Sequence, residues 1–223
     1  FKDFGLSIYK DERLHLTLRH HSYQTIQPSG HFHNDAGNIT LAVDGIPVIV
    51  DPGSYVYTPS AFWRNTFRSV QAHNTFYIKD VEPVLFNDKS LFYLDIPEKQ
   101  LCLEQDPWTS KHTLYSITAT RNVTFEAAHI ITLIDQWSDA THHTFMSYWN
   151  FTLAPDITAQ CQDSVWTLSY QTKPLLTIFS EDIEFSLVES WFAPEYGKKV
   201  PTKSLHASTP ITSQPIKTKI TLL

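Results

Sequence analysis

The stretch Ile39-Thr-Leu-Ala-Val-Asp-Gly-Ile-Pro-Val-Ile-Val50 predicts a β-hairpin. Apolar side chains alternate along its first five residues, as in a strand with one buried face. Asp44-Gly45 is a strong signal for a two-residue hairpin turn. The chain then returns as a buried strand, and Pro47 predicts that this strand lies at the edge of its sheet.

The register of this hairpin predicts which of the flanking residues lie opposite one another. A two-residue turn pairs Val43 with Ile46, and the same register places Asp51 opposite Asn38 rather than opposite His33. The chain must therefore bend before residue 38 for His33 to approach Asp51. The sequence Asn-Asp-Ala-Gly at 34–37 is a turn signal that permits this bend.

Strand signals continue along most of the chain, whereas long helical periods with caps are absent from the sequence. Strands are expected at 6–10, 14–19, 74–79, 91–96, 99–105, 113–120, 123–134, 143–152, 164–171, 174–180, 183–189 and 216–223. Loops are expected at 22–30, 54–72 and 194–213. The prediction is an all-β fold, a large antiparallel β-sandwich of many strands with few or no helices, formed by residues 1–223 as one domain.

Composition narrows the possible partners. The 223 residues carry a formal net charge of −6, and the longest run of basic residues is Lys198-Lys199. This balance argues against nucleic acid as a general partner. Apolar stretches reach only strand length, so no transmembrane span is predicted. The chain starts at Phe1 and its only methionine is Met146, so we expect it to be a piece of a longer protein.

A cluster of histidine and aspartate side chains stands out against this β-pattern. His31 and His33 are two residues apart and share one face if that segment is extended. His33, Asp51 and His73 supply the nitrogen and oxygen ligands that zinc prefers, with a fourth position left for water. His31 would then remain free to face a substrate. The alternative is that these are polar residues on unrelated faces.

Four stretches of the chain resemble the C-terminal β-domain of the heparinase II/III family of polysaccharide lyases. The stretches are His31-Phe-His-Asn-Asp-Ala-Gly-Asn38; Gly45 with Val50-Asp-Pro-Gly-Ser-Tyr-Val-Tyr57; Arg64-Asn-Thr-Phe-Arg-Ser69 with Ala72-His-Asn-Thr75; and Trp191-Phe-Ala-Pro-Glu-Tyr-Gly-Lys-Lys199. Together they span most of the chain, in a fixed order and spacing.

The resemblance implies a parent protein in which an N-terminal α/α-toroid precedes this domain. Such proteins cleave uronic-acid polysaccharides by β-elimination in the cleft between the two parts, so an anionic polysaccharide or oligosaccharide is the implied partner. A periplasmic or secreted bacterial location is expected. The toroid supplies further catalytic groups, so we expect this chain alone to be inactive.

The resemblance also implies roles for single residues. His31 falls at the active site, and His33, Asp51 and His73 bind a structural zinc ion. An aromatic hydroxyl of this domain takes part in some members, and Tyr55 and Tyr57 are both candidates for it. We place Tyr57 with the catalytic residues. The residues expected to hold the anionic sugar are Tyr55, Arg64 and Arg68, since arginine matches carboxylate and sulfate geometry.

Two other interpretations remain. A non-catalytic carbohydrate-binding or structural module could keep the zinc site while the parent protein lacks activity. A cupin-type metal enzyme also has an H-x-H pair in a β-sandwich, but cupins place a glutamate about four residues after the second histidine. Gly37 and Asn38 occupy that region of this chain, which argues against the cupin interpretation.

Overall fold

A computed structural model describes residues 1, 4–20, 32–86, 94–95, 106–114, 117–126, 129–138 and 145–223 of the chain. Antiparallel strands dominate these residues and form sheets of four, seven and four strands, with a small two-stranded sheet at one end. The predicted all-β class is therefore confirmed. None of the helices in the described residues is long and apolar enough to cross a membrane.

Within each sheet, the strands are named in the order in which they lie side by side. The first sheet contains β1 (Leu6–Lys10), β2 (Leu14–Arg19), β3 (Ile39–Val43) and β4 (Ile46–Ile49). The second contains β12 (Ile157–Gln162), β13 (Val165–Tyr170), β14 (Lys173–Phe179), β17 (Ile216–Leu222), β10 (Ile130–Ser138), β9 (Ile117–Glu126) and β8 (Thr109–Leu114). The third contains β15 (Ser186–Glu195), β16 (Lys198–Pro210), β11 (Met146–Thr152) and β5 (Phe76–Ile78). The small sheet pairs β6 (Leu85–Phe86) with β7 (Leu94–Asp95).

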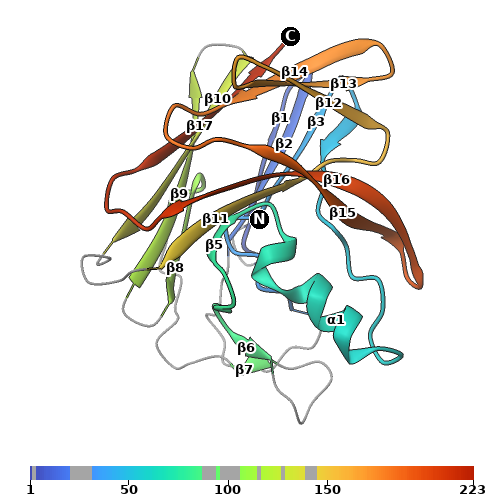
Figure 1. Cartoon of the computed structure of the whole chain (residues 1–223), viewed down its shortest axis with the longest axis vertical. Helices are drawn as coiled ribbons and strands as arrows, with labels where there is room; N and C mark the ends of the chain where they lie inside the picture. Colours follow the sequence, from blue (N-terminus) through green and yellow to red (C-terminus); the bar gives the residue numbers. More distant parts are fainter. Residues whose placement is uncertain are drawn as a thin grey trace.

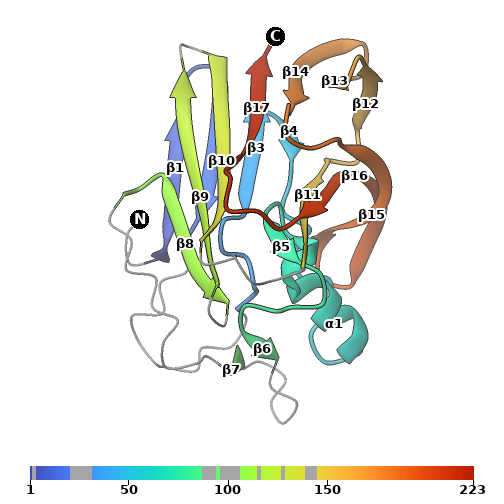
Figure 2. The same cartoon turned by 60° about the vertical axis from the view of Figure 1, so that its left-hand side comes forward.

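One hydrophobic core joins the three larger sheets. Side chains from all three sheets belong to a single buried cluster. At its centre the ring of Phe76 lies 4.8 Å from that of Trp137 and 6.1 Å from that of Trp149, measured between centroids. Burial of this apolar surface is the main source of stability for such a fold. Figures 1 and 2 show α1 (Ala61–Arg68) below the β15–β16 ribbon, at the end of the molecule opposite the C-terminus.

The predicted hairpin and bend are confirmed. Asp44 and Gly45 have φ angles of 52° and 78°, the paired positive values of a type I′ turn. Pro47 lies in β4, the last strand of its sheet. The bend before Asn38 closes with a hydrogen bond from the Asn38 amide to the carbonyl of Asp35, 3.0 Å long.

The register of the hairpin holds only near the turn. Val43 pairs with Ile46 as expected, but a bulge between Leu41 and Ala42 makes Leu41 the partner of Ile49. The extra residue moves the return strand along by one position. The expected pairing of Asn38 with Asp51 is therefore not continued by the ladder, although their side chains do meet through a hydrogen bond.

The prediction of a loop over 54–72 is wrong in its second half. This segment contains α1 and the 3-10 helix η2 (Val70–Ala72). The Ser60 hydroxyl caps α1 by accepting a hydrogen bond from the amide of Trp63. The buried face of the helix consists of Arg64, Phe67 and Arg68, at helical spacing. Because two of these three side chains are charged, the apolar period that announces a helix is missing from the sequence.

The prediction of a surface loop over 194–213 is also wrong. Most of it belongs to β15 and to β16. β16 buries Thr202, Ser204 and Ala207 despite its proline and serine content. The strand predictions also missed β12, which pairs with β13. The strand predicted at 99–105 lies outside the described residues.

Candidate functional site

The structure brings together three of the four histidine and aspartate side chains of the predicted site. His33 precedes β3 by six residues, Asp51 lies two residues after the end of β4, and His73 comes directly after η2. The centroids of the His33 and His73 rings are 5.3 Å apart. Asp51 Oδ2 accepts a hydrogen bond from Nδ1 of His73, with 2.8 Å between the atoms. His31 lies outside the described residues.

Asp51 and His73 form a strongly coupled pair. The His73 side chain is fully buried, whereas that of Asp51 is partly exposed. Burial disfavours the ionised form of Asp51, but the charge and hydrogen bond of His73 and the amide of Gly53 outweigh it and hold the pKa of this carboxyl below its usual value. Burial likewise works against the charged form of His73, yet Asp51 raises the pKa of this imidazole overall.

The pKa of His33 is shifted in the opposite direction from that of His73. Burial, followed by the charge of His73, lowers the pKa of His33 to about 4. At neutral pH its ring is therefore uncharged and keeps one nitrogen lone pair. Its Nε2 atom lies 3.4 Å from the hydroxyl oxygen of Ser54, which makes at most a weak hydrogen bond.

Asparagine side chains that the sequence did not single out fix this geometry. Asn38 donates from Nδ2 to Asp51 Oδ2 at 2.9 Å and accepts the amide of Asn74 at its own Oδ1. Asn74 donates from Nδ2 to the carbonyls of Ile39 and Val50. Sequence offers only a weak signal for them, their position beside the predicted ligands. They hold the ends of β3 and β4 against the segment that carries His73.

A buried arginine adds a second support from the core. Arg121 and Asp135 are almost fully buried and form a two-fold ion pair, with N–O distances of 2.7 and 2.6 Å. The other end of the guanidinium, Nη1, donates to the carbonyls of Gly37 and Asn74. It thus joins the segment after His33 to the residue that follows His73.

The tyrosine candidates lie on the loop that follows Asp51. Tyr55 has a φ of 53°, and its carbonyl accepts the amide of Gly197 at 2.7 Å. Its ring contacts Trp63 edge-on. The ring of Tyr57 lies 5.4 Å from that of Tyr196. Both tyrosines are partly exposed and border the β15–β16 hairpin.

The two candidate arginines point into the domain. Arg64 is 7% exposed and donates from Nη1 to the carbonyl of Tyr57. Arg68 is 4% exposed, and its Nε donates to the carbonyl of Phe32, beside His33. Burial, and then the nearby charge of Arg64, lower the pKa of Arg68. Each therefore braces a segment that carries a predicted site residue.

The donor set at this place is of the zinc type, two imidazoles and one carboxylate. The Nε2 atom of His73 is buried and has no hydrogen-bond partner within the described part of the chain. As the side chains stand, however, no three His, Cys, Asp or Glu residues among those described are arranged to hold a metal ion. The direct contact of Asp51 with His73 uses Oδ2 of the aspartate and Nδ1 of the histidine, and it does not involve Nε2 of His73.

No curated protein matches the chain. Among solved structures, it is similar to heparan sulfate lyase HepC from Pedobacter heparinus, with a TM-score of 0.69 and 16% identity, over 98% of this chain and 35% of that one. A heparinase III is similarly related, with a TM-score of 0.70 and 14% identity, over 99% of this chain and 35% of that one. The chain thus spans about a third of these relatives, and at such identity the likeness shows the fold alone.

The family follows from the sequence itself. The profile of the family described as Heparinase II/III-like, C-terminal, matches residues 1–221, which is nearly the whole chain. This match agrees with the four stretches of sequence that carry the resemblance and with the shared fold. The chain belongs to the heparinase II/III-like family, as a C-terminal β-domain of that family.

Proposed function

We propose that this chain serves as the C-terminal domain of a polysaccharide lyase that cleaves a uronic-acid polysaccharide by β-elimination. The observation that carries the proposal is the convergence of His33, Asp51 and His73, beside the loop of Tyr55 and Tyr57, in a chain of this family. The α/α-toroid partner and the periplasmic or secreted location belong to the same proposal.

We further propose a structural zinc site at His33, Asp51 and His73. Two features support it. His33 is neutral at physiological pH, as an imidazole ligand must be. His73 keeps a buried nitrogen that the described residues leave without a partner. When bound, zinc would supply a cross-link between the segments that carry these residues and would thereby hold the neighbouring segment that carries His31.

β-Elimination sets three tasks for the protein. The uronate carboxylate must be neutralised so that the proton at C5 becomes acidic, a base must remove that proton, and an acid must protonate the leaving oxygen at O4. We assign His31 to the neutralisation of the carboxylate or to proton transfer. Tyr57 transfers a proton through its hydroxyl. The toroid supplies the remaining groups.

We also propose that the anionic sugar is bound by Tyr55, Arg64 and Arg68. The proximity of the two guanidinium groups supports it, because the charge of Arg64 disfavours the charge of Arg68 and a nearby anion would relieve this repulsion. Their hydrogen bonds to backbone carbonyls fix where these charges lie. They would act as a positive field behind the loop of Tyr55 and Tyr57.

The test is the release of unsaturated uronate, followed by its ultraviolet absorbance, from the longer protein that carries this chain. Tyr57→Phe and Tyr55→Phe are matched variants that each remove one hydroxyl. We expect Tyr57→Phe to lower kcat by about a hundredfold or more, as for a lost proton-transfer group, and Tyr55→Phe to act mainly on KM. The 223-residue chain alone should release none. Saccharide binding without any cleavage by the longer protein would favour the non-catalytic module.

A further inference from the structure

Lys199, at the start of β16, is held by aromatic rings. Its Nζ atom lies 3.2 Å from the ring centroid of Trp191, 3.9 Å from that of Trp63 and 5.8 Å from that of Tyr55. These rings come from β15, from α1 and from the loop after Asp51. An ammonium over the face of an indole is attracted by the negative face of the ring. We call Lys199, Trp63, Trp191 and Tyr55 the lysine cage.

The ammonium of Lys199 has no carboxylate partner among the described residues, in contrast to its neighbour in sequence. Lys198 forms an exposed ion pair with Glu195, 3.3 Å long. Aromatic faces hold the charge of Lys199 in place but leave its positive charge unneutralised. A cation that is held in place and lacks a counter-charge is better prepared to bind an anionic ligand than a solvated lysine is.

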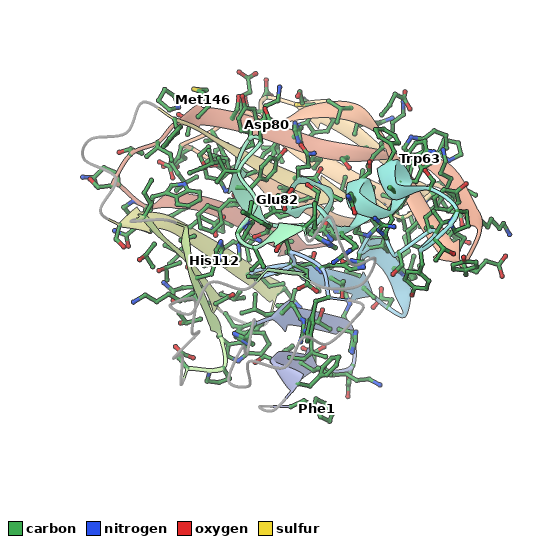
Figure 3. The ribbon with its side chains drawn as sticks, turned by 90° about the horizontal axis from the view of Figure 1, so that it is seen from below. Phe1, Trp63, Asp80, Glu82, His112 and Met146 are labelled. Atoms are coloured by element: carbon green, nitrogen blue, oxygen red, sulfur yellow. The ribbon has the colours of Figure 1, made fainter. Side chains whose placement is uncertain are left out.

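Exposed aromatic side chains lie in and beside the cage: Trp191 belongs to it, Phe62 contacts Trp63, and Tyr196 directly follows β15. Phe62 is 70% exposed, Tyr196 is 59% exposed and Trp191 is 40% exposed. Figure 3 shows Trp63 on α1 at the outer end of the molecule, next to the β15–β16 ribbon. Large, flat rings beside a cation can stack on the apolar face of a sugar while the cation binds its acidic group.

The cage is tied to the candidate site through the backbone. The carbonyl of Tyr55 accepts the amide of Gly197, two residues before Lys199. The carbonyl of Pro52, next to Asp51, accepts the amide of Ala193. The β15–β16 hairpin therefore continues the surface that begins at Asp51 and runs past Tyr55.

We propose that the lysine cage is a subsite for an acidic sugar unit of the polysaccharide. Lys199 binds the carboxylate or sulfate, and Trp191 stacks on the sugar ring. This inference rests on the proposed function, because it places the subsite along the path of the same substrate. An alternative role for this surface, contact with a protein partner, is an outcome of the test below.

The test is calorimetric titration of the 223-residue chain with a heparan sulfate oligosaccharide, an alginate oligosaccharide and a neutral malto-oligosaccharide. The first two separate sulfate from carboxylate recognition. Lys199→Met keeps the apolar stem and the contact with the rings but removes the charge. We expect it to weaken binding of at least one acidic probe by about tenfold or more. Lys199→Arg should restore most of the affinity, and Lys198→Met should bind like the unaltered chain.

Each result is informative. No binding of either acidic probe by the unaltered chain would overturn the subsite, whereas uronate release by the longer protein tests the proposed function separately. Binding that Lys199→Met leaves unchanged would overturn the subsite alone. If Lys199→Met fails to fold, Trp191→Ala at the exposed rim decides, and unchanged binding there overturns the subsite. Self-association that Lys199→Met abolishes, with unchanged affinity for the acidic probes, would assign the surface to a protein contact and also overturn it.

Discussion

Gly53 lies so close to Ala193 that a Cβ atom at position 53 would come within 2.4 Å of the Ala193 carbonyl oxygen. The φ of Gly53 is also +83°, a region that other residues enter at a cost. The amide of Gly53 donates to Asp51 Oδ1 at the same point. A single glycine therefore lets the loop after Asp51 meet the β15–β16 hairpin and still hold the carboxylate.

Gly53→Ala should lower the free energy of unfolding by about 2–5 kcal/mol, because strain in φ adds to a clash with backbone that cannot move aside. Gly45→Ala is the matched control, since Gly45 has a φ of +78° but no atom within 4 Å of the place that a Cβ atom would take. The control should lose only about 1–2 kcal/mol. Urea denaturation of both variants measures the difference, and equal losses would contradict the close approach.

Arg121 reaches the candidate site from the core. Arg121→Met should destabilise the chain by about 3–5 kcal/mol, because it leaves Asp135 charged and buried with the indole of Trp149 as its remaining described side-chain donor. Lys198→Met removes one partner of an exposed ion pair and should change stability by at most about 1 kcal/mol. Thermal and denaturant unfolding compare the two. A loss for Arg121→Met as small as that of the control would remove the core support assigned to this pair.

Asp44 gives the chain a pH-dependent contribution to stability. Hydrogen bonds from Arg13 and then from Lys173 lower the pKa of Asp44 from 3.8 to about 2. Because the folded-state pKa lies below the unfolded value, the stabilisation is complete above about pH 4 and disappears as the pH falls through about 2. Asp44→Asn keeps the turn geometry, since asparagine also tolerates a positive φ. The difference in Tm between the two proteins should shrink from pH 5 to pH 2, and a constant difference would refute this assignment.

The sequence predicted the parts of the fold that depend on local chemistry. Asp44-Gly45 specified its turn because both residues adopt positive φ readily. Pro47 specified an edge strand because proline has no amide hydrogen to donate. The bulge between Leu41 and Ala42 was not predictable, since the local pattern indicates the turn but not where the ladder gains an extra residue.

The parts that were missed depend on partners distant in sequence. The buried face of α1 includes the side chains of Arg64 and Arg68. Their burial cannot be foreseen from the sequence, because it depends on the backbone carbonyls to which they donate. In the sequence, Lys199 looks like one of two adjacent surface lysines. Its contact with Trp63, more than a hundred residues earlier in the chain, is known only from the structure. Ligand type left the meeting of His33, Asp51 and His73 open, and the family resemblance predicted it. The direct contact between Asp51 and His73 was not predicted.

The most direct test of the proposed zinc site is the zinc content of the purified 223-residue chain. Mass spectrometry measures it beside that of His33→Ala and of the control His206→Gln. His206 is also a partly buried histidine, but its Nε2 atom bonds to the hydroxyl of Tyr77. We expect about one zinc per chain in the unaltered protein and in the control, and a large loss in His33→Ala. Folded protein without zinc, or zinc retained by His33→Ala, would contradict it.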